Sequence, residues 1–162
     1  RLKTEGEQAD LYLAMVSELE RYGFEQYEIS NFAKKNYESA HNLKYWNSQE
    51  YLGIGPSAHS FINGERFFYP RSLKDFLSGN IKPVKDGTGG TMEEYAMLKL
   101  RLRTGISNSA FKSRFGVDIP QSYFRKAKIF QNHGLAVVDC DSIRLTPKGF
   151  LVSNKLISEI IF

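Results

Sequence analysis

The first part of the chain, "GEQADLYLAMVSELERYGF", carries apolar residues at the 3.6-residue spacing of an amphipathic helix. Gly23 stands where a helix C-cap is expected. The next residues, "FEQYEIS", predict a short strand. A helix, a glycine and a short strand in succession are typical of an α/β layer protein. The apolar face of the predicted helix contains Ala9, Tyr12, Leu13, Val16 and Leu19.

The middle of the chain alternates short apolar runs with turn residues. We expect a loop over "NFAKKNYESA" and a short helical turn over "HNLKYWN". The run "EYLGIGPSAHSFI" predicts a buried strand interrupted by Gly53, Gly55 and Pro56, and "ERFFYP" predicts another strand. In "SLKDFLSG", Ser72 is placed to N-cap a short helix.

Residues 79–90, "GNIKPVKDGTGG", predict a linker or long loop, because they combine four glycines and a proline with no apolar period. Beyond them, helices are expected over "TMEEYAMLKLRLRTG", with Thr91 as N-cap, over "SNSAFKSRFG" and over "IPQSYFRKAKIFQNHG". Two short strands in "LAVVDCDSIRLT" and a last helix over "TPKGFLVSNKLISEIIF" complete a winged-helix-like module.

Composition narrows the class of protein. The 162 residues are 41% hydrophobic and 25% charged, as in ordinary globular proteins, and the net charge of +4 permits an anionic partner without requiring one. No apolar run approaches the length of a membrane span, and no signal peptide is visible. Cys140 is the single cysteine, so this sequence cannot build a cysteine-ligated iron–sulfur cluster by itself. We expect a cytoplasmic protein.

His41, Asn42, Tyr45 and Trp46 form the first group of candidate functional residues. An imidazole can bind a metal or a haem iron, or carry a proton near neutral pH. If the turn is helical, Tyr45 shares a face with His41 and Trp46 flanks it, which makes a cradle for a planar ligand such as a porphyrin. The alternative is that both rings are core or rim aromatics and that His41 is a hydrogen-bonded surface residue.

The segment "LGIGPSAHS" is the second candidate. Glycines and a proline inside an apolar strand reduce its propensity, and close approach of a ligand to the backbone is one explanation. A β-bulge without a ligand is the other. His59, at the end of the segment, either faces a cavity or is a hydrogen-bonded core histidine.

Basic side chains in the second half raise the question of nucleic acid. They lie on or near the pair of helices that a winged helix would use on DNA. Acidic residues elsewhere and apolar residues within the pattern favour a solvated basic face instead, so no nucleic-acid partner is expected. The basic residues are Lys112, Arg114, Arg125, Lys126 and Lys128.

The order of these segments resembles a known family. "YEISNFAKKNYESAHNLKYWNSQEYLGIGPSAHSF" is similar to the stretch that marks HemW-type radical S-adenosylmethionine proteins, which are related to oxygen-independent coproporphyrinogen III oxidase. The resemblance continues through "EEYAMLKLRLRTGIS" and "LTPKGFLVSNKLISEII" and so covers nearly the whole chain.

The resemblance implies a fold in two parts. Residues 1–62 would be the last helix and strand units of an incomplete (β/α) barrel, residues 63–90 a connection, and residues 91–162 a winged-helix-like helical C-terminal domain. The family barrel carries a [4Fe–4S] cluster and S-adenosylmethionine. The cofactor's pocket would be bordered here by Gly53, Gly55, Pro56, Ala58 and His59.

The resemblance also implies a ligand. The His-Asn-x-x-Tyr-Trp motif is linked to haem binding in the family's haem chaperones and is absent from the sister oxidases; here it is His41, Asn42, Tyr45 and Trp46. We therefore expect a haem or porphyrin contact at these residues, with His41 as the candidate iron ligand, and haem-accepting proteins at the membrane as candidate recipients. The alternatives are a coproporphyrinogen III oxidase and a winged-helix nucleic-acid binder.

The family's Cys-x3-Cys-x2-Cys motif is missing from this sequence. We therefore expect the chain to be a C-terminal piece of a longer protein, with no radical chemistry of its own. An open half-barrel would expose sheet edges and apolar surface, and for that reason we expect it to pair as a homodimer or to rearrange.

Overall fold

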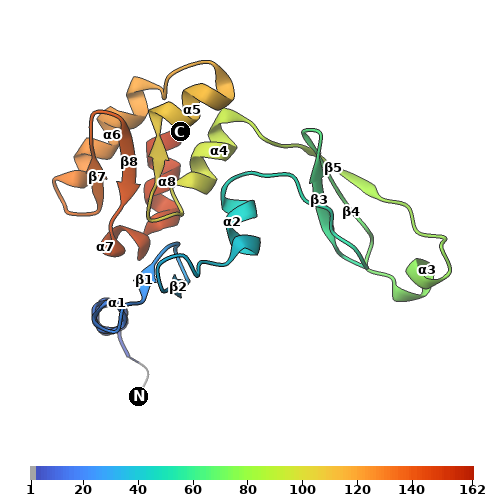
Figure 1. Cartoon of the computed structure of the whole chain (residues 1–162), viewed down its shortest axis with the longest axis horizontal. Coiled ribbons are helices and arrows are strands. Elements are labelled where there is room, and N and C mark those ends of the chain that lie inside the picture. Colours follow the sequence, from blue (N-terminus) through green and yellow to red (C-terminus); the bar gives the residue numbers. More distant parts are fainter. Residues whose placement is uncertain (1–2) are drawn as a thin grey trace.

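The computed structural model describes residues 3–162. Three parts are visible in Figure 1: a body made by the C-terminal half, a smaller N-terminal part beside it, and an arm that projects from the body. The arm is a three-stranded sheet with a short helix at its far end. In residues 3–162, no helix has the length and apolar character needed to cross a membrane.

The N-terminal part begins with helix α1 (Glu5–Arg21), which a capping box at Thr4 starts. The five residues of the predicted apolar face are the only helix positions that are not exposed, and Val16 is buried. The predicted strand after the helix is reduced to β1 (Glu25–Gln26), which pairs antiparallel with β2 (Phe32–Ala33) in what we expected to be a loop. Helix α2 (Ala40–Trp46) follows, N-capped by Ser39, which confirms the predicted helical turn.

The arm contains β3 (His59–Ile62), β4 (Glu65–Phe68) and β5 (Val84–Thr88), all antiparallel in the order β3-β4-β5. The β3–β4 turn uses Asn63 and Gly64, both at positive φ, as a two-residue hairpin turn requires. Helix α3 (Leu73–Leu77) lies between β4 and β5 and begins at the predicted N-cap, Ser72.

Two expectations for this region were wrong. Residues 79–90 are not an unstructured linker, because residues 84–88 form β5; the open edge of β4 supplies hydrogen-bond partners that do not depend on side-chain pattern. Residues 51–58 are not a buried strand, since Leu52 and Ile54 are 61% and 83% exposed and only an isolated bridge joins Tyr51 to Phe61. Positive φ angles at Gly55 and Ser57 interrupt the ladder there.

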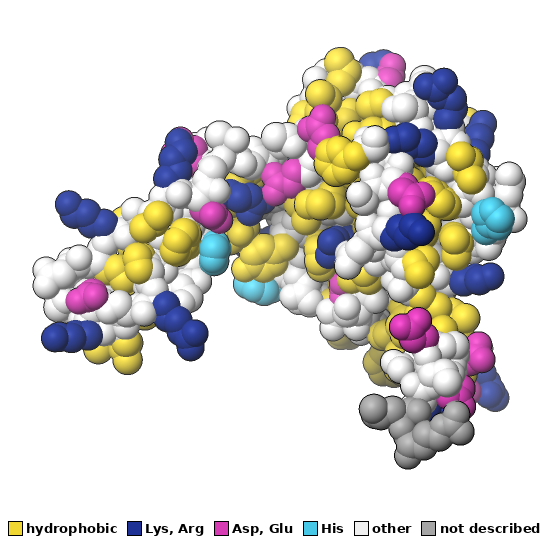
Figure 2. All heavy atoms as spheres, turned by 180° about the vertical axis from the view of Figure 1, so that it is seen from behind, with side chains coloured by type: hydrophobic (Ala, Val, Ile, Leu, Met, Phe, Trp, Pro, Cys, Tyr) yellow, Lys and Arg dark blue, Asp and Glu magenta, His cyan; other side chains and the backbone are white. Residues whose placement is uncertain are grey.

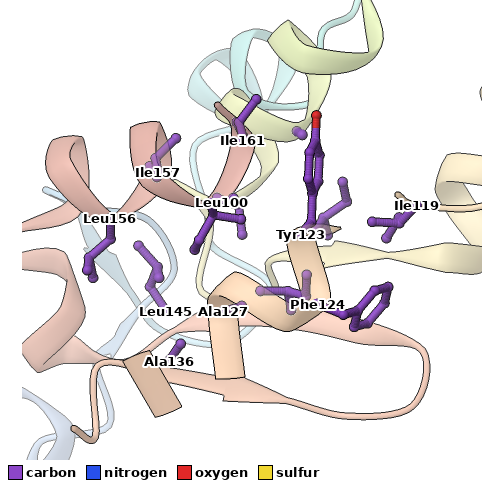
Figure 3. Packing of buried hydrophobic residues seen from close by; sticks show 14 of the residues in the cluster. Leu100, Ile119, Tyr123, Phe124, Ala127, Ala136, Leu145, Leu156, Ile157 and Ile161 are labelled. Carbon is purple, nitrogen blue, oxygen red and sulfur yellow. The ribbon is translucent and has the colours of Figure 1, made fainter. Parts of the chain in front are cut away.

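The body consists of helices packed on a small sheet in the order β6-β8-β7. Its apolar residues form one core, part of which Figure 3 shows between α6, α8 and the sheet. In chain order its elements are α4 (Met92–Lys99), β6 (Ile106–Ser107), α5 (Asn108–Phe115), α6 (Gln121–Gln131), β7 (Ala136–Val138), β8 (Ser142–Leu145), α7 (Pro147–Phe150) and α8 (Ser153–Ile161).

The body departs from the expected elements in two places. Strand β6 adds a third member to the predicted pair of strands, because Ile106 lies opposite Ile143. The predicted last helix is two helices, since Val152 (φ −124°, ψ 24°) leaves the helical region between α7 and α8.

A short backbone ladder joins the N-terminal part to the body. The amide of Ile29 donates to the carbonyl of Arg101 at 3.0 Å, and the amide of Arg103 donates to the carbonyl of Tyr27 at 3.0 Å. Glu28, between them, forms a bridge with Leu102, and its side chain is buried. This ladder places α2 beside α4, which builds the surroundings of the candidate site.

Candidate functional site

Helix α2 brings the predicted aromatic group together. The rings of His41 and Tyr45 lie edge to face, with centroids 5.0 Å apart, as expected for residues one helical turn apart. Tyr51 adds a ring that sequence reasoning missed, 4.5 Å from Tyr45 and also edge to face. His41 is exposed, so its imidazole is accessible to a ligand.

The surface beside these rings is hollowed. Asn42, Tyr45 and Trp46 line a hollow of about 290 Å³, whereas His41 lies beside it, against Tyr45. Asn42 Nδ2 donates a long hydrogen bond of 3.4 Å to the hydroxyl of Tyr27. Figure 2 shows hydrophobic side chains and histidine gathered in the angle between arm and body.

Cations from the body reach the end of α2. Lys99 Nζ donates to Asn47 Oδ1 at 2.9 Å, and burial lowers the pKa of the Lys99 ammonium. The guanidinium of Arg101 stands over the ring of Trp46, 5.7 Å from its centroid. Sequence reasoning missed these contacts. The available signal was the alternation of leucine and cation in "LKLRLR", which continues beyond the end of α4.

The glycine-rich segment after α2 is shaped by its own backbone. A Cβ at Gly53 would lie 2.2 Å from the carbonyl oxygen of His59, so alanine does not fit there. The Gly53 amide donates to Ser60 Oγ at 3.0 Å. Contact between the segment at Gly53 and strand β3 of the same chain therefore accounts for Gly53 without a ligand. At Gly55, by contrast, a Cβ would meet nothing within 4 Å, although φ is +117°.

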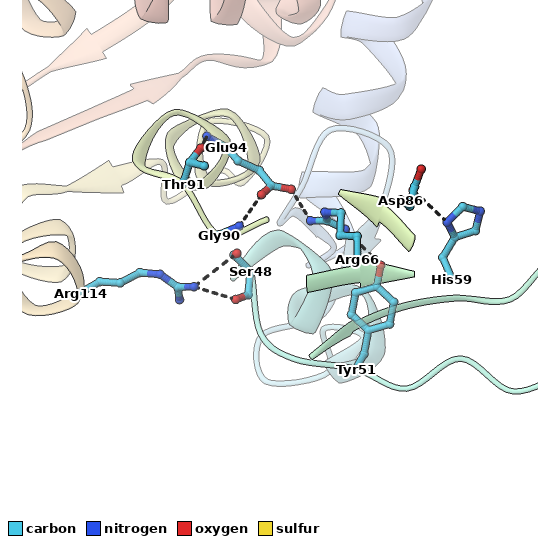
Figure 4. A network of polar contacts seen from close by, with 9 residues as sticks. All are labelled: Ser48, Tyr51, His59, Arg66, Asp86, Gly90, Thr91, Glu94 and Arg114. Atoms are coloured by element: carbon cyan, nitrogen blue, oxygen red, sulfur yellow. Dashed lines mark hydrogen bonds and ion pairs between the residues drawn. The ribbon is translucent and has the colours of Figure 1, made fainter. Parts of the chain in front are cut away.

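His59 lies on the arm and does not join the α2 group. Its side chain is 57% exposed, which excludes a core histidine, the second of the two alternatives left open by the sequence. The ring stacks on Phe68, with centroids 5.1 Å apart, and Nδ1 lies 3.5 Å from Asp86 Oδ2 (Figure 4).

Two of the five basic candidates have partners within the protein. Lys112 pairs with Asp118 at 3.1 Å, and Arg114 donates to the carbonyl of Ser48 at 3.1 Å while lying over the ring of Tyr95. Arg114 thus holds the segment that follows α2 against the body. In residues 3–162, no three His, Cys, Asp or Glu side chains gather in a set that could hold a metal ion.

The arm is fixed to the body by a polar network (Figure 4). Glu94, on α4, pairs with Arg66 of β4 and accepts from the amide of Gly90 at 2.6 Å. Both side chains of the ion pair are largely buried, and the Arg66 guanidinium also lies over Phe61, 4.8 Å from the ring centroid.

We expect Glu94→Ala to lower the free energy of unfolding by about 2 kcal/mol, because it removes the charged acceptor of the Arg66 guanidinium and of the Gly90 amide, both at least partly buried. Denaturant unfolding measures the change, and limited proteolysis within residues 63–90 reports release of the arm. Glu93→Ala is the matched control, since Glu93 is exposed and lies in the same helical turn. Equal losses in the two variants would contradict a role for this network.

Comparisons with known proteins agree on one group of relatives. The model of the HemN C-terminal domain matches residues 91–152. The chain is 31% identical over 167 residues to the heme chaperone HemW of Bacillus subtilis, covering 99% of this chain and 44% of that protein. It is 35% identical over 147 residues to HemW of Buchnera aphidicola subsp. Schizaphis graminum, covering 86% of this chain and 39% of that protein.

The chain is a HemW/HemN-like protein. It matches the C-terminal portion of its relatives and spans less than half of their length. Coproporphyrinogen III oxidase (HemN) from Escherichia coli, described as a radical SAM enzyme, has a similar fold: the TM-score is 0.67 at 17% identity, covering 99% of this chain and 42% of that one. This chain therefore has a mixed α/β fold with small antiparallel sheets that matches the C-terminal part of HemN in structure.

Proposed function

We propose that this chain belongs to a haem chaperone and that α2 contacts the haem. The observation that carries the proposal is the packing of His41 against Tyr45 beside a hollow lined by Asn42, Tyr45 and Trp46. An exposed imidazole next to an aromatic hollow suits a flat ligand that contains iron. Relatives that bear the name heme chaperone HemW support this assignment.

Each side chain then has a distinct role toward haem as cargo. His41 supplies a nitrogen ligand for the iron, because neutral imidazole is a common haem ligand. Tyr45 and Trp46 pack against the macrocycle, and Tyr51 supports Tyr45 through the edge-to-face contact of their rings. Asn42, with only a long bond to Tyr27, is free to donate to a polar substituent of the ligand.

The remaining assignments from the family resemblance belong to the same proposal. We place the barrel units at residues 1–62, the connection at 63–90 and the winged-helix-like domain at 91–162, in a cytoplasmic protein. The exposed apolar side chains of Leu52 and Ile54 are surfaces that the rest of the barrel or a second copy would cover. The recipient of the haem would be an acceptor protein at the membrane.

Of the two radical cofactors of the family, only S-adenosylmethionine has candidate contact residues in this chain, and these would form one edge of its pocket. The exposed Cys140 alone does not supply the three thiolates that a [4Fe–4S] cluster of this family needs, so this chain by itself does not fit the cluster. Around Gly55 the segment with Pro56, Ala58 and His59 is open to a ligand, and we propose it as an edge of the S-adenosylmethionine pocket. Gly53 contributes there through its contact with His59, which shapes the segment.

A haem titration followed by absorption spectroscopy tests the site. We expect wild-type protein to shift the Soret band and to saturate near one haem per chain, and His41→Ala to lose that shift because it lacks the iron ligand. His133→Ala is the matched control, since His133 is an exposed histidine beyond the end of α6. Equal binding by all three proteins would rule out His41. An absence of binding would remove the proposal and favour the porphyrinogen oxidase.

A further inference from the structure

Lys99 and Arg101 belong to the body, and their side chains reach the C-terminal end of α2. Within residues 3–162, the ion pairs that form include neither of them. Both side chains are partly buried, and burial of an unpaired charge is costly. The cost is offset where a ligand carries the opposite charge.

The contacts of Arg101 leave much of its hydrogen-bonding capacity unused. Its Nε is buried and has no partner, while Nη2 makes one long bond of 3.3 Å to Asn154 Oδ1. A guanidinium presents five N–H groups in a rigid fork, which matches the two oxygens of a carboxylate. The nearest buried acid along this ladder, Glu28, accepts from Asn31 and does not form an ion pair with Arg101.

Arg101 also connects two hollows. It lies over Trp46, which lines the hollow on α2, and it lines a second hollow of about 380 Å³ in the body. The second hollow mixes apolar and hydrogen-bonding side chains. Its lining residues are Met97, Arg101, Asn154, Ile157, Ser158 and Phe162.

We propose that Arg101, assisted by Lys99, binds the carboxylate substituents of a porphyrin whose ring lies against Trp46. The inference deepens the proposed function and rests on it. A flat apolar ring fits the aromatic hollow, and a flexible acid side chain reaches the cations next to it. Paired hydrogen bonds between a guanidinium and a charged carboxylate are stronger than hydrogen bonds between neutral groups. The acid groups of the porphyrin therefore select the ligand and set its orientation.

Iron-free protoporphyrin IX and its dimethyl ester test the proposal, because neither uses an iron ligand and only the first carries charged carboxylates. Binding is followed by porphyrin fluorescence. We expect wild-type protein to prefer the diacid about tenfold, a value in the range of a charged hydrogen bond. Arg101→Gln should remove most of this preference without changing ester binding, and Lys99→Gln should remove part of it. Arg71→Gln, beside α3 at the far end of the arm, should change neither (Figure 1).

The outcomes separate this proposal from the one about His41. If Arg101→Gln keeps the wild-type preference, or if wild-type protein binds diacid and ester equally, the carboxylate assignment is wrong even where His41→Ala still loses haem. If His41→Ala binds haem normally while Arg101→Gln loses the preference, the carboxylate site stands and the iron ligand is wrong. Failure of wild-type protein to bind any porphyrin overturns both.

A second variant distinguishes ligand binding by Arg101 from a purely structural role of this residue. If Arg101→Gln does not fold, Arg101→Lys takes its place, because it keeps a positive charge over Trp46 but lacks the forked N–H groups of the guanidinium. We expect Arg101→Lys to retain an intermediate preference for the diacid and an unchanged denaturation midpoint. Full wild-type preference in a folded Arg101→Lys together with no effect of Lys99→Gln would contradict the proposal.

Discussion

Phe111→Ala is expected to lower the free energy of unfolding by about 4 kcal/mol, the usual cost of removing a fully buried aromatic ring. Phe111 has no exposed surface, and its ring lies 4.9 Å from that of Phe115 and 6.1 Å from that of Tyr95. It joins α5 to α4 in the core, so its removal leaves a cavity between helices that the remaining contacts hold in place.

Urea unfolding followed by circular dichroism measures this loss. Phe162→Ala is the control, because Phe162 is 80% exposed and its truncation should cost less than about 0.5 kcal/mol. Similar midpoints for the two variants would show that the body is not packed around Phe111.

Gly105→Ala is expected to destabilise the body by about 3 kcal/mol through two effects. A φ of +68° costs an L-residue about 1 kcal/mol. The new Cβ would lie 2.1 Å from the carbonyl oxygen of Ile143, which forces β6 away from β8 and adds about 2 kcal/mol of overpacking.

Gly116→Ala isolates the first effect from the second. Gly116 has a similar φ of +74°, but a Cβ there would meet nothing within 4 Å. We expect it to lose only about 1 kcal/mol in the same unfolding measurement. If both variants lose the same amount, close approach of β6 to β8 is not what requires glycine at residue 105.

These predictions bear on the candidate site because the body holds α2 in place. Arg114 of α5 fixes Ser48, Lys99 of α4 bonds Asn47, and the ladder at Glu28 adds a backbone connection. A variant that loosens α4 or α5 therefore weakens ligand binding at α2 without touching a ligand. Binding and unfolding should be measured on the same protein samples.

Local chemistry made parts of the fold predictable. The α1 face, the Ser72 and Thr91 caps and the α2 turn each depend on side chains within a few residues of one another. Strand β5 was missed because its ladder depends on β4, and its exposed sequence "VKDGT" carries no apolar alternation. The Leu52 and Ile54 run was misassigned because apolar composition alone does not say whether anything covers it.

For the candidate site too, contacts within one helix were predictable from the sequence, and contacts between distant segments were not. The contact between His41 and Tyr45 was predictable from spacing within a single short helix, where i and i+4 residues meet whatever the rest of the chain does. The family resemblance is what singled out Asn42 and Trp46 with them as a candidate ligand contact. Tyr51 and Arg101 were not identified, because their contacts with α2 depend on a turn and on a ladder between distant segments.

The sequence by itself determined the helices, their caps, the aromatic spacing on α2 and the family resemblance, since each depends on side chains close together along the chain. Only the tertiary structure decided that Gly53 packs against His59, that the arm is a three-stranded sheet, and that Lys99 and Arg101 of the body reach the end of α2. The physical reason is that backbone ladders and burial bring together residues far apart in sequence, and the pattern within any one segment does not encode its distant partners.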